Sequence, residues 1–169
     1  MICLSIMAIA FMASCRGPQG PIGPAGHDGN ANVASSTVTV YANDWQWVNH
    51  CQWMVDIDYP AINDNVFNYG AVLVYMREDH VWTQLPVTYY YTFNDAQLGL
   101  LNCEASIEVA TLDDGGVRLF WTESDFWDGM QPGTHDFKIV AIEASVYDNR
   151  SDVDYSDYNA VKAAFQLAD

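Results

Sequence analysis

Apolar residues recur along the chain after residue 33 in short stretches separated by turn-forming residues. In residues 51–59, every second position from Cys51 to Ile57 is apolar, which is the pattern of a β-strand with one buried face. The stretches are also rich in β-branched and aromatic residues, which favour strands. We therefore predict strands at residues 35–42, 51–59, 71–77, 87–93, 103–112, 117–123 and 135–146.

Two further patterns complete the fold prediction. The sequence Asp113-Asp114-Gly115-Gly116, between two predicted strands, supplies residues that adopt positive φ in a tight hairpin turn. Ser156 is placed to cap a closing helix, and the apolar positions on one face of that helix are Tyr158, Val161, Phe165 and Ala168. Successive strands with a helix only at the end predict an all-β fold, an antiparallel β-sandwich with a short C-terminal helix. The strand order stays open, so a jelly roll is an alternative.

The N-terminal segment is uncharged and apolar, with the sequence MICLSIMAIAFMAS over residues 1–14. Its apolar run is shorter than the roughly 20 residues that a membrane-spanning helix needs, and it fits the apolar core of a signal peptide. The following residues, Met12-Ala13-Ser14-Cys15, resemble the lipobox of bacterial lipoproteins, in which the cysteine becomes lipidated. We expect cleavage before Cys15 and a lipid anchor on it. The alternative is a buried N-terminal strand with an incidental cysteine.

A collagen-like segment comes next, so that residues 15–32 hold the lipidated cysteine and a spacer. Five glycines follow one another at every third position, from Gly17 to Gly29, and proline fills the position after the first three. This composition favours an extended polyproline-II chain, which would reach about 45 Å from the membrane. A monomeric spacer is the preferred interpretation, and a collagen-type trimer is the alternative.

The lipobox, the glycine repeat and the acidic, aromatic domain together resemble the collagen-like lipoproteins of Bacteroidetes. The resemblance continues through Asn30-Ala31-Asn32-Val33, AVLVYM at 71–76, WTQLP at 82–86 and VKAAFQL at 161–167. It implies an envelope lipoprotein with a β-rich domain at residues 33–169, anchored at the cell outer membrane. It brings no known catalytic residues, and whether the domain faces the surface or the periplasm stays open.

The net charge of the chain narrows the classes of molecule that it can bind. The 169 residues include 22 acidic and only 6 basic side chains, a formal net charge of −16. Such a chain repels nucleic acid and anionic lipid, so we expect no nucleic-acid partner and membrane attachment only through the lipid.

Two cysteines remain in the predicted domain, Cys51 and Cys103. Both begin predicted strands, so contact across the two sheets would allow a disulfide that closes a loop of about 50 residues. Export to an oxidising compartment favours such a bond. Two buried thiols are the equally weighted alternative.

No catalytic motif is found, and no cofactor or metal is predicted. Glu104 and Glu108 lie about 13 Å apart along one strand, farther than the acid and base of a glycosidase. The stretch from Asp152 to Asp157 begins like a calcium loop but lacks the turn glycine and the bidentate glutamate. We expect these acids to solvate a loop and to favour the helix N-terminus.

Aromatic residues are the feature that could support ligand binding. Trp127, flanked by Asp125 and Asp128, is predicted to lie in a loop, and Trp45 is a second candidate platform. Packing in the core is the alternative for most of the aromatic residues. An exposed aromatic ring beside carboxylates is typical of glycan sites. The preferred hypothesis is a non-enzymatic envelope lipoprotein whose domain binds a glycan or an envelope protein or associates structurally. A glycan-binding module and a hydrolase with a site assembled by the fold are the alternatives.

Overall fold

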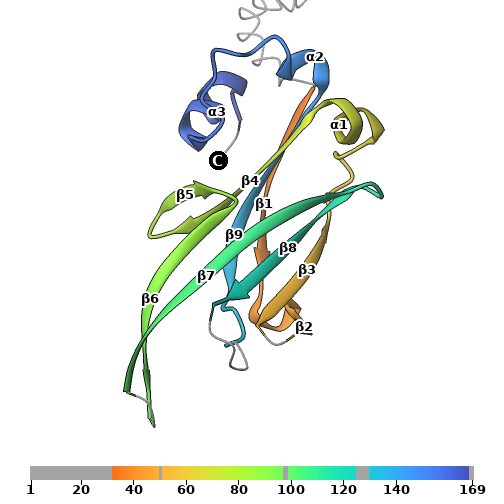
Figure 1. Cartoon of the computed structure of the whole chain (residues 1–169). Coiled ribbons are helices and arrows are strands. Elements are labelled where there is room, and N and C mark those ends of the chain that lie inside the picture. The colour runs from red at the N-terminus through yellow and green to blue at the C-terminus, as the bar shows by residue number, and fades with distance from the viewer. Residues whose placement is uncertain (1–31, 50, 97–98, 125–129, 168–169) are drawn as a thin grey trace, which may run out of the picture.

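The structure is a computed structural model that describes residues 32–49, 51–96, 99–124 and 130–167. Its strands form two antiparallel sheets that pack face to face (Figure 1). The prediction of an all-β sandwich with a short C-terminal helix is confirmed. The signal segment and the collagen-like spacer lie outside the described residues.

One sheet has four strands and contains both the first and the last strand of the domain. In spatial order its strands are β1 (Val33–Val40), β9 (His135–Ile142), β4 (Ala71–Glu78) and β5 (Val81–Gln84).

The other sheet has five strands. In spatial order they are β2 (Gln46–Asn49), β3 (Gln52–Asp58), β8 (Gly116–Glu123), β7 (Gly99–Leu112) and β6 (Val87–Asp95). The last three are consecutive in sequence and lie side by side as a meander. Such a meander differs from the paired Greek keys of a jelly roll.

Short helical segments join and cover the strands. They are η1 (Ala42–Asp44), α1 (Asp64–Tyr69), α2 (Ala144–Tyr147) and α3 (Tyr158–Phe165). In the described part of the chain, none of these helices has the length and apolar character needed to cross a lipid bilayer.

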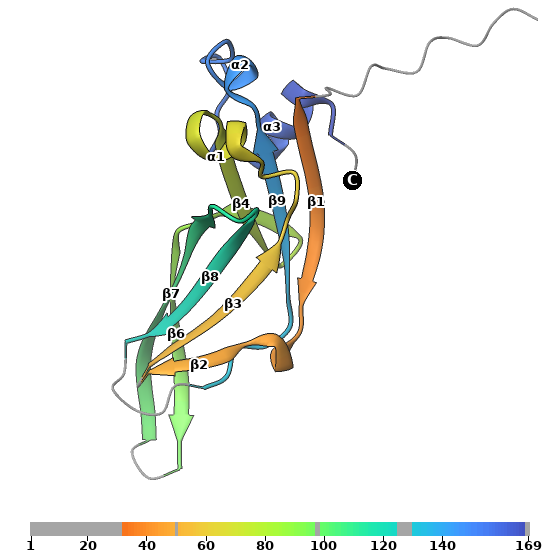
Figure 2. The ribbon, with the colours of Figure 1, turned by 90° about the vertical axis from the view of Figure 1, so that its right-hand side faces the viewer.

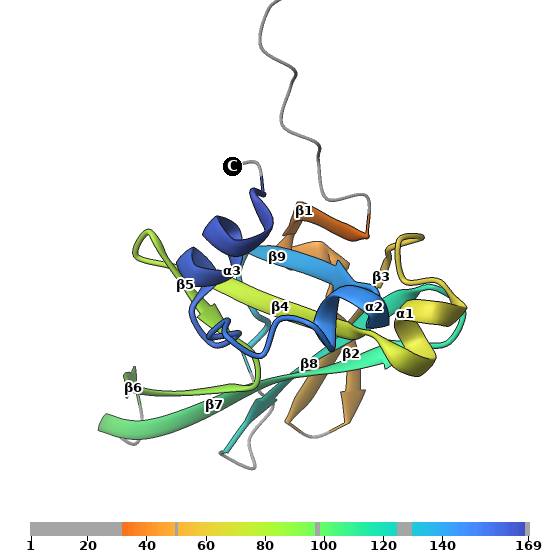
Figure 3. The same ribbon diagram turned by 90° about the horizontal axis from the view of Figure 1, so that it is seen from above.

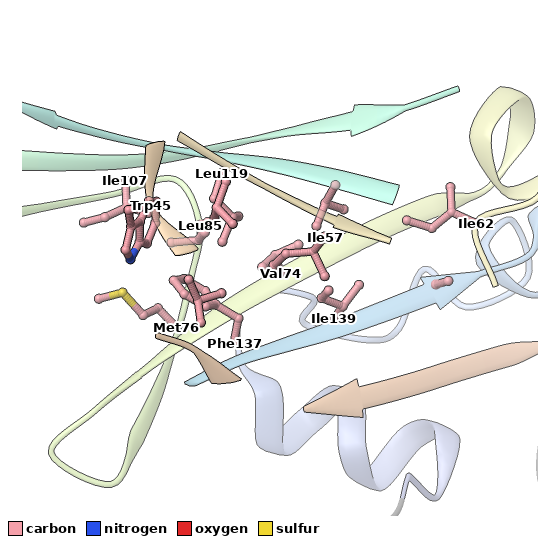
Figure 4. Packing of buried hydrophobic residues seen from close by; sticks show 14 of the residues in the cluster. Trp45, Ile57, Ile62, Val74, Met76, Leu85, Ile107, Leu119, Phe137 and Ile139 are labelled. Atoms are coloured by element: carbon pink, nitrogen blue, oxygen red, sulfur yellow. The ribbon is translucent and has the colours of Figure 1, made fainter. Parts of the chain in front are cut away.

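The main core lies between the two sheets. It is formed by the apolar side chains that each strand points inward at alternate positions. Val55 and Ile57 of β3 face the same interior as Leu119 of β8, and all three are buried. The opposite sheet contributes Val74, Phe137 and Ile139 (Figure 4).

A second apolar layer covers the outer face of the four-stranded sheet (Figure 3). Val161 and Phe165 of α3 are buried against Val140 of β9 and Tyr75 of β4. The central strands β4 and β9 are therefore buried on both faces, which explains why AVLVYM is apolar without alternation.

Several predicted boundaries differ from the structure: β1 ends at Val40 rather than at residue 42, β7 begins at Gly99 rather than at residue 103, and two further differences have clear physical reasons. The last strand ends at Ile142 rather than at residue 146, because Ile142 pairs with Val33, where β1 begins, and α2 follows. The cap of α3 is Asp157 instead of Ser156, and the Asp157 carboxylate accepts a hydrogen bond from the Asn159 amide at 2.8 Å.

Candidate functional site

The most exposed large aromatic side chain in the described residues lies on a strand rather than in a loop. Tyr90 of β6 is 80% exposed. It borders an open hollow of about 470 Å³ on the ribbon formed by β6 and β7, which extends beyond the sandwich at one end (Figure 1). An exposed flat ring on a strand is a surface on which another molecule can stack.

Polar side chains surround this ring because of the pairing register. Glu104 of β7 lies directly opposite Tyr90, and Asn102 lies opposite Thr92 two residues farther along the ribbon. Residues two apart on a strand face the same side, so the four side chains share one face of the ribbon. Together with Ser124 they offer a carboxylate, an amide and two hydroxyls beside the ring.

The wall of the hollow is held by reciprocal hydrogen bonds at the end of β8. The Glu104 amide donates to the Ser124 hydroxyl at 3.0 Å, and the Ser124 amide donates to the Glu104 carbonyl at 2.8 Å. These bonds fix the backbone on which the Glu104 carboxylate is mounted, which limits the conformational freedom that a ligand would have to remove.

A buried carboxylate lies next to the hollow in sequence, on the inner face of the same sheet. Glu123 is 5% exposed and accepts hydrogen bonds from the Tyr91 hydroxyl and, at 2.7 Å, from the Trp121 indole nitrogen. Both carboxylate oxygens therefore have a donor, as a buried acid requires. This arrangement is a structural network that joins β8 to β6 beneath the hollow.

Trp45, a candidate platform for which core packing was the alternative, is part of the core. It is 3% exposed, its ring packs edge-on at 6.1 Å from Trp121 and 6.4 Å from Phe137, and its indole nitrogen donates to the Gly133 carbonyl at 3.3 Å. Trp45 is therefore no platform: η1 turns the chain so that its side chain points inward ahead of β2. His135 packs at 5.1 Å from Trp121, and burial there lowers the pKa of His135.

The other predicted platform residues, Trp127, Asp125 and Asp128, lie outside the described residues, as does the predicted lipidation site Cys15.

The candidate disulfide is not formed: Cys51 lies in the turn before β3 and Cys103 on β7, so both are at the five-stranded sheet rather than on opposite sheets. The Glu123 amide donates to the Cys51 carbonyl at 2.8 Å, and Glu123 in turn pairs with Ala105, two residues from Cys103. Strand β8 thus separates the cysteines by two strand spacings, about 9.5 Å, whereas a disulfide needs Cα atoms within about 7 Å.

The acidic residues before α3 form an ion pair and hydrogen bonds with neighbouring residues of the chain. Asp152 pairs with Arg150 at 3.1 Å, and Asp154 accepts hydrogen bonds from the amide and hydroxyl of Ser156, which lower the pKa of Asp154. In the described ranges, no group of three or more His, Cys, Asp or Glu side chains is arranged to hold a metal ion.

Sequence reasoning missed the Tyr90 hollow, although a signal for it was present. The strand contains three successive tyrosines, Tyr89, Tyr90 and Tyr91. They cannot all face the core of the sandwich, because successive side chains of a strand point to opposite faces of the sheet. With Tyr89 packed against the core and Tyr91 bound to Glu123, the middle ring faces outward.

No protein-family model, curated protein or solved structure gives a significant match to this chain.

Proposed function

We propose that the chain is a lipoprotein of the bacterial cell envelope whose β-sandwich is a non-catalytic ligand-binding domain. In this proposal Cys15 carries the lipid at the outer membrane, and residues 15–32 hold the domain away from the lipid surface as a monomeric spacer. The observation that supports the binding function is the exposure of Tyr90 on strand β6, at the border of a hollow lined by hydrogen-bonding groups.

A glycan is the ligand class that this hollow favours. The face of a tyrosine ring stacks on the C–H bonds of a sugar ring, while carboxylate, amide and hydroxyl groups at its border bind sugar hydroxyls. Tyr90, Glu104 and Asn102 provide this combination on one face of the ribbon. The net charge of −16 and the Glu104 carboxylate disfavour acidic sugars, so the expected ligand is a neutral glycan.

The glycan proposal predicts that Tyr90→Ala weakens binding by about tenfold or more, a loss of about 1.4 kcal/mol. Tyr90→Phe keeps the ring face and should bind nearly as well as the wild type. The measurement is isothermal titration of the full-length chain in detergent with neutral hexasaccharides of glucose, xylose, mannose and N-acetylglucosamine.

Tyr69→Ala is the matched control, because Tyr69 is also highly exposed, at 73%, but lies at the end of α1. Binding that Tyr69→Ala weakens as much as Tyr90→Ala would argue against a site at the hollow. If none of the four sugars binds, the glycan proposal is wrong.

The anchor is tested separately by the mass of the N-terminal peptide from membranes of the producing cell. We expect a peptide that begins at Cys15 and carries acyl chains, and Cys15→Ser should release the protein from the membrane fraction. Several acyl chains make such attachment durable, because each buried methylene contributes about 0.8 kcal/mol. An unmodified peptide beginning elsewhere would disprove the lipoprotein proposal but leave the hollow as a binding site.

A further inference from the structure

Strand β1 forms an edge of the four-stranded sheet, and among the described strands none pairs with its outer side. Natural proteins protect such edges with charged residues, proline, irregular pairing or very short strands. β1 has none of these devices, because its sequence VASSTVTV is uncharged and its eight pairs with β9 run without a shift in register. By contrast, β2 and β5 have four residues each, and the pairing of β2 is irregular.

One hydrogen bond shows which amides and carbonyls of β1 point towards β9 and which point away from the sheet. The Glu143 amide donates to the Asn32 carbonyl at 2.9 Å, so this opposing pair is a hydrogen-bonded one. Hydrogen-bonded and non-bonded pairs alternate in an antiparallel ladder, so the even-numbered residues of β1 bond to β9. The amides and carbonyls that point away from the sheet belong to Val33, Ser35, Thr37 and Thr39. They form a regular row that another strand can bind.

A hollow of about 490 Å³ lies beside the C-terminal half of this edge, between β1 and β3. Figure 2 shows β1 at the margin of the domain with β3 next to it on the other sheet. The hollow exists because β2 covers β3 only as far as Met54. Val38 and Val40 line one side, and Val55 and Ile57 line the other. Because Val40, Val55 and Ile57 are buried, the inward side chains of an added strand would meet mainly half-buried Val38 and the polar residues Asn43 and Gln46 that also line the hollow.

Charge decides which kind of strand fits. Asp44 lines the hollow near the end of β1, and Glu143 lies opposite the residue that precedes β1, so a carboxylate flanks each end of the uncharged edge. The second acid at the hollow, Asp56, is already bound by Arg118 at 2.6 and 2.7 Å, which lowers the pKa of Asp56. In an antiparallel pair of two β1 strands, the acidic ends of both copies would meet, and each copy carries a net charge of −16.

We propose that the free edge of β1 binds an extended segment of another protein, which adds as a strand to the four-stranded sheet. The segment has small and β-branched residues in its middle and a lysine or arginine near each end, facing Asp44 and Glu143. Main-chain hydrogen bonds supply the affinity of such strand addition, and the flanking charges supply its polarity. This surface is distinct from the Tyr90 hollow, which belongs to the other sheet.

The test selects random decapeptides displayed on phage against the full-length chain in detergent. We expect enrichment of peptides with alternating β-branched residues and basic ends, bound equally well by Tyr90→Ala. Thr37→Pro removes an outward-pointing amide at an exposed position of an edge strand, where proline is tolerated, and should weaken binding by about tenfold or more.

A second measurement leaves the protein unchanged. The best peptide is synthesised with N-methyl groups on one set of alternate residues and, separately, on the other set. Strand addition requires that one methylated peptide lose binding and the other retain it, because only alternate amides face β1.

Two double variants test whether the carboxylates that flank β1 contribute to peptide binding. Asp44→Asn with Glu143→Gln should weaken binding about fivefold at low salt and reduce its salt dependence. Asp44→Asn retains an acceptor for the Tyr41 amide, which the Asp44 carboxylate binds at 2.8 Å. Glu108→Gln with Asp148→Asn removes two exposed carboxylates elsewhere and should change nothing.

Three outcomes would overturn the proposal. They are no enrichment of any peptide, equal binding of both N-methylated peptides, and sedimentation of the wild type as a dimer that Thr37→Pro dissociates. The last outcome would identify a second copy of the chain as the occupant.

Discussion

Phe165→Ala is expected to lower the free energy of unfolding by about 3–5 kcal/mol, the usual loss for truncating a buried phenylalanine. Phe165 is 2% exposed and fixes α3 to the outer face of the four-stranded sheet. Its ring stacks at 6.3 Å on Tyr155, and the Arg150 guanidinium lies 5.3 Å from its centre. Urea unfolding followed by circular dichroism measures the loss.

The same substitution should also loosen the cover of the sheet before the domain unfolds. Without Phe165, α3 keeps Tyr158 and Val161 as its buried contacts with β4 and β9. We expect increased fluorescence of a hydrophobic dye at urea concentrations where the wild type binds none. Phe67→Ala, on α1 and 40% exposed, is the matched control and should have a small effect on both measurements. Equal losses for the two variants would show that α3 contributes little to stability.

Glu123→Ala is expected to destabilise the domain by about 2–4 kcal/mol, because it removes a buried carboxylate that accepts hydrogen bonds from two half-buried donors. The donors are the Tyr91 hydroxyl and the Trp121 indole nitrogen. Glu123→Gln retains one carbonyl oxygen and should lose less than Glu123→Ala. Chemical unfolding of the three proteins gives the order directly.

Glu108→Ala is the control for this series, since Glu108 lies on β7 of the same sheet and is exposed. It should change stability by no more than an ordinary surface substitution, about 0.5 kcal/mol. A Glu123→Ala protein as stable as Glu108→Ala would mean that water replaces the carboxylate and that the inner face is open at this end of the sheet.

The strands with clear signals were predicted well, and the short elements were not. The continuous apolar stretch AVLVYM predicted β4, which is buried on both faces. The alternation in residues 51–59 predicted β3, which is buried on one face, because burial of one face alone makes every second residue apolar. β2 and β5 have four residues each, too few for a period to be recognised. Helix α1 was missed although Asn63 caps it by accepting hydrogen bonds from the Asn65 and Val66 amides. Six residues show less than two turns of helical periodicity.

The candidate site shows the limit of the same reasoning. Trp45 was one candidate platform, but its exposure depends on which way the chain turns before β2, and periodicity does not encode that turn. Tyr90 could be assigned to the outer face by alternation alone. That Glu104 would lie opposite it depends on the register of β6 and β7, which the sequence does not reveal.

The path of β1 through the domain has a mechanical consequence. β1 begins at the end of the sandwich where α1 and α2 lie, whereas the β6–β7 ribbon extends from the opposite end (Figures 1 and 2). A pull between the N-terminal side of Val33 and a molecule held on the ribbon therefore acts along β1. The hydrogen bonds of the ladder are perpendicular to its strands, so all eight residue pairs of β1 and β9 would bear the load in shear together rather than separate one after another. Such a pull would therefore meet more resistance from the β1–β9 ladder than a force that peels β1 away from one end.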